Sequence, residues 1–410
     1  MFNEKPIISK WVADMYDQKV TETNDVDFLL SVIGQTPKRI LEVCCGSGRI
    51  LVPLAKAGHQ VSGFDYDEFM LAKIPAKAEE LQNIAWQKSD AIQDDWGTGF
   101  DVVVLAGNIL YNIVSDMDYT KSQELLIQKA ASALVPGGYV YIEYQPGGHR
   151  IAQSTPSHDN NDGEWVVWEG TDNDGNSGKM SLTSGSYDAA TGMSSFMRRF
   201  ELTLKNGEKI TQDIQCGKHF APLEQLRGWL RGAGFIIEQE YSDFKGNPVN
   251  DDSRGIVIYA RKKEQIEYKN IDERIYEKIV GTYGDWIKKY IKLDANAFAL
   301  SAMDGDFPAG FICVTPRTLT YPLEHIQDAF IEVLEVDEQY QRQGIGRYLV
   351  ERGEEWAVKN GFQQIRTHSN DKAANAIKLW NKLNYGLCPH VFYAEEGCKG
   401  YWVAKPLKND

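Results

Sequence analysis

The order of apolar and polar residues in the first half of the chain predicts alternating strands and helices. An apolar run at 40–43 precedes Gly46 and Gly48 and leads into a segment with helical spacing. A second apolar run then ends at Asp65. Strand, glycine turn, helix, strand and acid follow one another in a right-handed crossover, whose ligand lies at the carboxyl ends of the strands. The pattern therefore predicts a Rossmann-like, doubly wound α/β sheet.

After residue 144 the spacing changes to short alternating runs, which are typical of antiparallel strands. Asn206 and Gly207 form a strong hairpin-turn signal between two of these runs. The expected elements are strands at 165–168, 179–187, 200–204 and 210–216, a helix at 223–233, and closing strands at 235–241 and 256–261. We therefore expect a first domain at 1–262 with an antiparallel insertion at about 150–220, which follows a polar stretch at 147–163.

The second half of the chain predicts a smaller α/β domain. No low-complexity linker follows residue 262, so we expect a short join and a domain at 264–410. The expected elements are a helix at 271–291, strands at 297–302, 310–314 and 329–336, a turn at 304–306, and helices at 348–359 and 374–385. The last of the three strands runs into a turn with Gly344 and Gly346 that opens a helix. Successive backbone N–H groups in such a turn suit a pyrophosphate.

Composition supports two folded domains and limits the class of partner. The 410 residues exceed one ordinary core, and ten Trp, twenty Tyr and sixteen Phe supply ample apolar area. The formal charge of −14 argues against a nucleic acid as the main partner, because a phosphate backbone needs a basic surface. No window approaches the roughly 20 apolar residues of a membrane span, so no membrane partner is expected. The acidity favours solubility through a charged, solvated surface, and it is also compatible with small, cationic molecules as partners.

The cysteines and the N-terminus predict a reduced, cytoplasmic protein. The six Cys are scattered, with no CxxC pair and no His spacing suited to zinc, so no metal site is expected. The N-terminus lacks a basic-then-apolar signal pattern. The acids at 171–175 do not have the spacing of a calcium loop, which favours a simple turn.

The first glycine turn favours an adenosine ligand without a pyrophosphate. A nicotinamide-binding turn needs a third glycine where this chain has Leu51, and the chain has no triphosphate-binding loop. Asp65 lies about 20 residues after the turn, where an acid commonly binds the two hydroxyls of a ribose.

These residues resemble the class I S-adenosylmethionine-dependent methyltransferases. The family's first motif, (E/D)xGxGxG, is matched by Glu42, Gly46 and Gly48, with Cys44 in place of the first glycine. The resemblance implies a cofactor site formed by Tyr16, Glu42, Gly46, Gly48, Asp65, Tyr66, Asp90, Ala91 and Asn108.

Several of these residues have roles that the resemblance implies. Tyr16 is expected at the ligand's carboxylate, Asp65 at the ribose and Tyr66 over the adenine. Asp90 is expected to accept from the adenine amino group, although it could instead cap a helix. Asn108 and Tyr111 either contact the substrate or only shape the end of a strand. The antiparallel insertion resembles a lid over the crevice, and its candidate lining residues are Trp165, Tyr187, Arg198, Arg199 and His219.

The second glycine turn resembles the (Q/R)xxGx(G/A) signature of the GNAT superfamily of acetyltransferases. Gln341, Gly344 and Gly346 carry the match. The resemblance implies acetyl-CoA as cofactor, held by Leu334, Val336, Gln341, Arg342, Gly344, Ile345, Gly346 and Arg347. Backbone N–H groups at 334–336 are expected to polarise the thioester carbonyl.

The acid and base of acetyl transfer are less well specified. Glu332 is slightly favoured over Glu335 as the base that deprotonates the acceptor amine. Because side chains alternate along a strand, we expect the two glutamates on opposite faces. Trp380 occupies the position of the tyrosine that usually protonates the departing thiolate. The candidate substitutes for that acid are Asn370, Asn375 and Tyr385.

The sequence therefore predicts a bifunctional transferase for small amine-bearing molecules. Three readings stay open: both units are active; the second unit only binds acetyl-CoA as a sensor or in assembly; or both units modify proteins. The sequence leaves the substrate, the methylated atom and the oligomeric state open.

Overall fold

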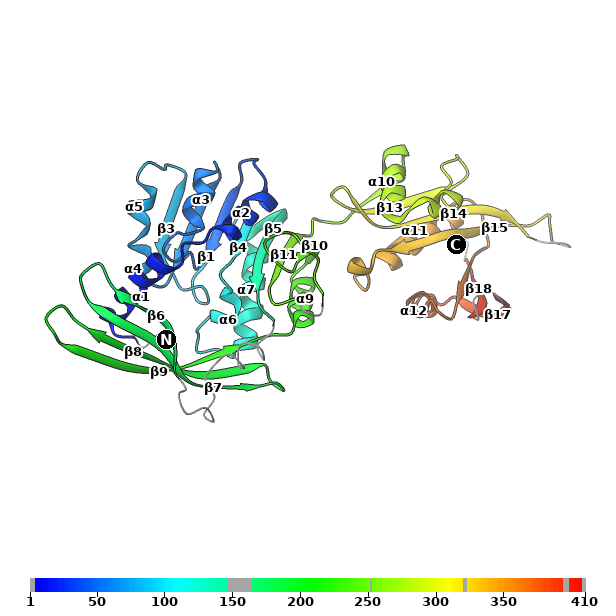
Figure 1. The fold of residues 1–410 in the computed structure, drawn as a ribbon. Coiled ribbons are helices and arrows are strands. Elements are labelled where there is room, and N and C mark those ends of the chain that lie inside the picture. Colours follow the sequence, from blue (N-terminus) through cyan, green and yellow to red (C-terminus); the bar gives the residue numbers. More distant parts are fainter. Residues whose placement is uncertain (1–3, 147–163, 251–252, 320–322, 394–397, 408–410) are drawn as a thin grey trace. The chain divides into compact units, whose positions relative to one another are not determined.

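The computed structural model describes residues 4–146, 164–250, 253–319, 323–393 and 398–407 (Figure 1). The polar stretch at 147–163 lies outside these residues. The chain forms two compact units, Met1–Lys263 and Glu264–Asp410. No helix in the described residues is long and apolar enough to cross a membrane.

The first unit contains a seven-stranded sheet in the order β10-β11-β5-β4-β1-β2-β3. Its strands are β1 (Arg39–Val43), β2 (Gln60–Asp65), β3 (Ile84–Lys88), β4 (Phe100–Leu105), β5 (Leu134–Tyr144), β10 (Phe235–Tyr241) and β11 (Ile256–Lys262). Strands β1 to β5 are parallel, and β11 pairs antiparallel with both β5 and β10. The helices of this unit are α1 (Pro6–Lys19), α2 (Asn24–Ile33), α3 (Leu51–Lys56), α4 (Glu68–Leu71), α5 (Ile74–Ala78), α6 (Ile109–Asn112), α7 (Tyr119–Ala133) and α9 (Leu223–Gly232).

Both faces of this sheet are buried, as the continuous apolar runs of its strands predict. Val103 and Leu105 belong to one core cluster, which also contains residues of α6, α7 and α9. Their neighbours Val102 and Val104 belong to a second cluster, which contains residues of α2, α3 and α5. Successive side chains of β4 therefore point into two different cores, one on each face of the sheet, which confirms the doubly wound α/β architecture.

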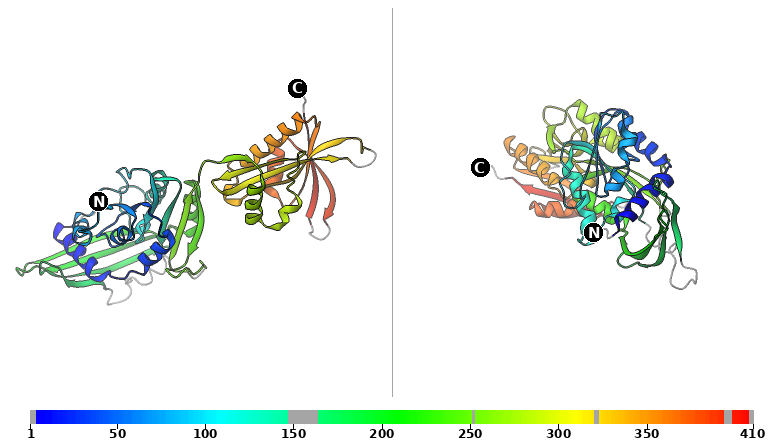
Figure 2. Two further views of the ribbon diagram at one scale, coloured as in Figure 1. Left: turned by 90° about the horizontal axis from the view of Figure 1, so that it is seen from above. Right: turned by 90° about the vertical axis from the view of Figure 1, so that its left-hand side faces the viewer.

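A separate four-stranded antiparallel sheet, called the lid below, packs against α1 (Figure 2). Its strands are β6 (Trp165–Thr171), β7 (Ser177–Asp188), β8 (Met193–Thr203) and β9 (Lys209–His219). The expected hairpin turn joins β8 to β9, with Gly207 at φ 87°. Trp11 of α1 is fully buried against the lid, where a Cβ on Gly178 would lie 2.8 Å from its ring.

The second unit contains a sheet in the order β12-β13-β14-β15-β16-β18-β17. Its strands are β12 (Glu267–Asn270), β13 (Phe298–Asp304), β14 (Phe307–Thr318), β15 (Gln327–Val336), β16 (Gln364–Asn370), β17 (Gly386–Tyr393) and β18 (Cys398–Pro406). Its helices are α10 (Glu273–Tyr283), α11 (Ile345–Lys359) and α12 (Ala374–Lys382), with 3-10 helices η1 (Asp285–Lys289) and η2 (Glu338–Tyr340).

Strands β15 and β16 form the parallel pair of this sheet, and they separate along their length. They pair at Ala329–Ile365 and Phe330–Arg366. The Thr367 hydroxyl then donates to the Ile331 carbonyl at 2.9 Å. Beyond that point no strand pairs with this edge of β15 among the described residues. The backbone from Val333 to Val336 is therefore left open on one side.

The helix expected at 271–291 is not continuous. It ends at Tyr283 because Gly284 adopts a φ of 94°, a left-handed conformation that an α-helix cannot contain. The 3-10 helix η1 follows, and Ile287 within it is fully buried with Ile279 of α10. The apolar stripe thus continues across a break in the helix.

Candidate functional sites

The first glycine turn is held against the carboxylate of Asp65. The backbone N–H of Gly46 donates to Asp65 Oδ2 at 2.8 Å, and that of Asp67 donates to Oδ1 at 2.9 Å. Gly46 and Gly48 have φ of 52° and 75°. A Cβ on Gly46 would meet no atom within 4 Å, so this side of the turn is open. The structure thus brings together the turn and the acid at the carboxyl ends of β1 and β2.

Two buried acceptor atoms beside this turn have no donor among the residues that the structure describes. Glu42 is 4% exposed and its Oε2 has no hydrogen-bond partner, and the Oδ1 of Asn108 is also buried without one. Burial, followed by the nearby carboxylates, raises the pKa of Glu42 well above its usual range. Unpaired buried acceptors are costly, so this site fits a ligand that brings N–H or O–H donors.

Glu143 and Arg49 are two residues of this site that the sequence analysis missed. The Gly107 N–H donates to Glu143 Oε2 at 2.8 Å, and burial raises the pKa of Glu143 to about 7. Arg49 forms a two-bond ion pair with the buried Asp25, at 2.8 and 2.5 Å. Asp25, and after it Tyr16, raise the pKa of Arg49, so Tyr16 lies near this guanidinium. The sequence signal that could have identified Arg49 as a site residue is its position directly after Gly48.

The second glycine turn lies between β15 and α11. Gly344 has a φ of 89° and is the N-cap of α11. The Gln341 side chain donates to the Val336 carbonyl at 3.1 Å and accepts from the Asn375 amide at 3.1 Å. Arg342 and Arg347 are exposed. The structure therefore places a free helix N-terminus and two arginines beside the open edge of β15.

Comparison with known proteins assigns both units. Residues 40–138 match a methyltransferase domain family, and residues 266–385 match the acetyltransferase (GNAT) family. The chain joins a methyltransferase domain to a GNAT domain. The putative methyltransferase YqeM of Bacillus subtilis is 22% identical over 270 residues, which cover 63% of this chain and 99% of that protein.

Further similarities cover the methyltransferase unit. The putative methyltransferase GWCH70_2453 of a Geobacillus species is 24% identical over 233 residues, or 56% of this chain and 86% of that protein. The solved structure of the CcbJ methyltransferase from Streptomyces caelestis is 21% identical, covers 62% of this chain and 97% of its own, and has a TM-score of 0.48.

The remaining predicted residues of the methyltransferase unit lie around the same strand ends. Tyr66 is 45% exposed, with the Lys88 ammonium 5.7 Å from its ring centroid. Asp90 Oδ1 accepts from the N–H groups of Ile92 and Gln93, so one carboxylate oxygen caps its own turn. Ala91 is buried.

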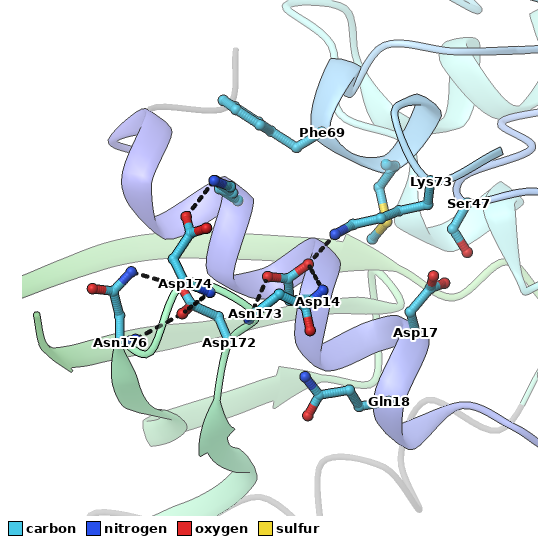
Figure 3. Close-up of polar contacts among 12 residues, drawn as sticks. Asp14, Asp17, Gln18, Ser47, Phe69, Lys73, Asp172, Asn173, Asp174 and Asn176 are labelled. Atoms are coloured by element: carbon cyan, nitrogen blue, oxygen red, sulfur yellow. Dashed lines mark hydrogen bonds and ion pairs between the residues drawn. The ribbon is translucent and has the colours of Figure 1, made fainter. Parts of the chain in front are cut away.

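The lid of the methyltransferase unit is tied to α1 through buried Asp14 (Figure 3). Its carboxylate accepts from Lys73 and from the backbone N–H of Asn173, which is in the β6–β7 turn. In that turn Asp172 accepts from two backbone N–H groups, which confirms the predicted simple turn.

The same helix is also bonded to the glycine turn. Lys77 donates to Asp17 of α1 at 2.8 Å and to the Ser47 carbonyl at 2.8 Å. Because Ser47 lies between Gly46 and Gly48, α1 connects the lid to the candidate cofactor turn.

The lid contains a cavity, which we call the lid cavity. Its apolar lining residues are Trp165, Val167, Met180, Leu182, Phe196 and Phe220, and its polar ones are Ser194, Arg198 and Lys218. Arg198 and Trp165 therefore line the cavity, as the sequence suggested.

The other three lid candidates have partners elsewhere. Arg199 lies on the opposite side of its strand from Arg198 and pairs with Asp213 at 2.7 Å. His219 is buried and bonded to Gln123, and Tyr187 packs on the core around α6 and α7.

In the GNAT unit, Glu332 is bonded through both carboxylate oxygens. It accepts from the Thr315 hydroxyl at 2.6 Å and from Arg317 at 3.0 and 2.6 Å. Among the described residues Glu335 makes no such ion pair, and burial raises its pKa.

The two glutamates do not lie on opposite faces, which corrects the sequence-based expectation. Strand β15 has a bulge in its pairing with β14, where Val333 pairs with Cys313 but Ile331 pairs with Val314. The extra residue is Glu332, whose carboxylate accepts from Thr315 of β14. Thr315 is on the same face of β14 as Phe311, and Phe311 pairs with Glu335. A bulge shifts the alternation by one residue, so both glutamates face α10.

The candidates for the thiolate acid also have defined surroundings. Trp380 is buried, and its indole N–H has no hydrogen-bond partner. The Tyr385 hydroxyl donates to Glu354 at 2.8 Å, and burial raises its pKa. Asn370 accepts from the Ala373 N–H at 3.1 Å, next to the start of α12.

Proposed function

We propose that the protein transfers a methyl group from S-adenosylmethionine and an acetyl group from acetyl-CoA to small amine-bearing molecules. The observation that carries this proposal is the contrast between the two glycine turns. One is surrounded by acceptor atoms without donors, namely Glu42 Oε2 and Asn108 Oδ1. The other is a helix N-terminus with Arg342 and Arg347 beside it. The first suits a cofactor with hydroxyl and ammonium donors, and the second suits phosphates.

In the methyltransferase unit the residues mainly position the reactants. S-adenosylmethionine, when bound, supplies a sulfonium methyl that is already activated. In this proposal Asp65 accepts from two ribose hydroxyls, and Glu42 and Asn108 accept from the ammonium group. An amine in line with the methyl then reacts without a strong base, since most of the rate comes from proximity and alignment.

In the GNAT unit the turn at 341–347 binds phosphates and the open edge of β15 receives the thioester. Acetyl-CoA, when bound, supplies the activated acetyl group. Glu335 is supported as the base by its raised pKa and because no described arginine pairs with it. Glu332, the residue that the sequence slightly favoured, is bonded through both carboxylate oxygens to Arg317 and Thr315, so neither oxygen is open to an acceptor amine.

A second candidate function is that the GNAT unit binds acetyl-CoA without turning it over. Trp380 cannot donate a proton as a phenol does, and the Tyr385 hydroxyl is bonded to Glu354. This favours a sensor or an assembly role, in which the cofactor is retained.

Calorimetry with each cofactor, followed by turnover assays, tests the proposal. We expect one site for each cofactor, loss of S-adenosylmethionine in the presence of an amine panel, and release of free thiol from acetyl-CoA. Binding of acetyl-CoA without thiol release supports the sensor. Failure to bind either cofactor contradicts both candidate functions.

As part of this proposal the protein works in the cytoplasm. The free thiols of Cys44, Cys45, Cys216, Cys313 and Cys388 support a reducing compartment.

A further inference from the structure

The lid cavity adjoins the site proposed for methyl transfer. The Phe220 ring in the cavity wall lies 4.9 Å from the ring of Tyr111, measured between centroids. Tyr111 is in α6, three residues after Asn108 at the carboxyl end of β4. The floor of the cavity therefore lies beside the strand end at which a methyl acceptor has to arrive.

Lys218 contributes a partly buried cation to this cavity. Its ammonium lies 4.7 Å from the ring centroid of Tyr111 and 5.8 Å from that of Phe196. Among the described residues, no carboxylate or carbonyl accepts a hydrogen bond from it. Burial, and after it the charge of Arg198, lowers the pKa of Lys218 to about 8. The aromatic rings thus hold an ammonium that has no anionic partner in the part of the chain that the structure describes.

Arg198 adds a second donor that is not satisfied. Its Nε is buried without a hydrogen-bond partner. Glu4 lies 3.5 Å from Arg198 Nη1, and burial raises the pKa of this acid. Among the described residues, the cavity therefore has two partly buried cations and one acid beside them, and the ionisation of that acid is itself disfavoured. Since cations that are partly removed from water are costly unless they are paired, the arrangement calls for an anion.

We propose that the methyl acceptor has an apolar body about the size of one ring, together with an oxyanion that binds between Lys218 and Arg198. This inference rests on the proposed methyl transfer and narrows its substrate class. The acceptor amine is then joined to a carboxylate or a phosphate. The rings of Trp165, Phe196 and Phe220 pack on the apolar body, and the two cations orient it.

The proposed ion pair between Lys218 and the substrate's oxyanion predicts that anion affinity depends on pH. The groups that face the Lys218 ammonium are Arg198 of β8, Cys216 of its own strand β9, and Tyr111 of α6. Burial raises the pKa values of the Cys216 thiol and of the Tyr111 hydroxyl, which favours the neutral form of both. Below about pH 8 Lys218 is charged and binds an anion. As the pH rises through that value the charge is lost, and anion affinity falls with it.

The test titrates the full chain, in the absence of S-adenosylmethionine, with each of four small probes. Ligand-observed NMR measures the binding of each probe. The probes are benzoate, phenyl phosphate, benzyl alcohol and benzylamine, which share a ring and differ in charge. At about pH 7 we expect the two anions to bind about tenfold more tightly than the other two, the effect of one charge-assisted hydrogen bond. The carboxylate and the phosphate probes distinguish the two sources of the oxyanion.

Three variants make the test specific. Lys218→Met is expected to abolish the preference for anions, whereas Lys209→Met, at the exposed start of the same strand, leaves it unchanged. Lys218→Arg keeps the preference and removes its fall between about pH 7 and about pH 9, because arginine stays charged. Thermal melting checks that each variant is folded. If Lys218→Met does not fold, the pH dependence of Lys218→Arg still tests the proposal.

The proposal is overturned if benzylamine binds best, if Lys218→Met leaves the anion preference intact, or if none of the probes saturates the wild-type chain. These outcomes do not depend on cofactor binding. A chain that binds benzoate at Lys218 but does not bind S-adenosylmethionine keeps the anion site and contradicts the proposed methyl transfer.

Discussion

The two glycine turns of this chain have similar backbones and opposite electrostatic surroundings. Each has one non-glycine residue in a left-handed conformation, Cys44 at φ 56° and Arg342 at φ 62°. The first turn precedes a helix of 6 residues and is bonded to the Asp65 carboxylate. The second caps a helix of 15 residues and has two arginines, and no acid is bonded to it among the described residues.

This difference shows that the charges around a turn, more than its glycines, decide which ligand it can hold. A long helix behind exposed N–H groups favours phosphates, while nearby carboxylates disfavour them and favour hydroxyl or ammonium donors. Substitutions that remove the charge from one turn should therefore affect one cofactor and leave the other unchanged.

The largest effect is expected for Asp65→Ala in the methyltransferase unit. The change removes the acceptor for the Gly46 and Asp67 N–H groups and the predicted ribose contact. We expect S-adenosylmethionine affinity to fall at least about 100-fold, while acetyl-CoA affinity stays the same. Calorimetry measures both, with Asp116→Ala, an exposed acid, as control. Equal losses for the two cofactors would mean that the variant unfolds the chain.

In the GNAT unit, Glu335→Gln is expected to lower kcat for acetyl transfer about 100-fold. Only the ionised carboxylate is a base, and burial raises the pKa of Glu335. The wild-type rate should therefore rise with pH through that raised value, and the rise should be absent in the variant. Glu332→Gln should leave the pH profile intact and lower the melting temperature, because it removes the Arg317 ion pair. The reverse pattern would assign Glu332 as the base.

The acids around the first turn predict that the methyltransferase unit loses stability as the pH rises. Burial raises the pKa of Glu143 to about 7, so the folded state binds a proton that the unfolded state releases above its lower pKa. The free energy of unfolding should fall by about 2 kcal/mol between about pH 5 and about pH 8. Glu143→Gln should flatten this dependence in denaturant titrations. An unchanged slope would show that Glu143 ionises freely in the folded chain.

The sequence predicted the sheet and the two turns because their signals are local. An apolar run followed by Gly46 and Gly48 specifies strand and turn without reference to the rest of the chain. The bulge at Glu332 and the helix break at Gly284 depend on packing against β14 and η1, so periodicity missed both. Lys218 looks like one polar residue in an alternating strand, and only the folded lid places it beside Tyr111.

A smaller effect is expected when Arg342 and Arg347 are both replaced by Gln in the second turn. We expect acetyl-CoA affinity to fall about tenfold at low salt and less at high salt, because exposed charges are screened. S-adenosylmethionine affinity should not change. Lys359→Gln, at the other end of α11, is the matched control for a lost surface charge. A loss that is independent of salt would argue against contacts between these arginines and phosphates.

The smallest effect concerns the residue that replaces the first glycine of the methyltransferase motif. Cys44 has a φ of 56°, which costs a residue with a Cβ about 1 kcal/mol relative to glycine. Cys44→Gly and Cys44→Ala both remove the partly buried thiol, but only the first relieves this backbone strain. Cys44→Gly should therefore be more stable than Cys44→Ala by about 1 kcal/mol in urea titrations. If the alanine variant is equally stable, the turn has moved out of the left-handed region, and S-adenosylmethionine affinity should fall in that variant as well.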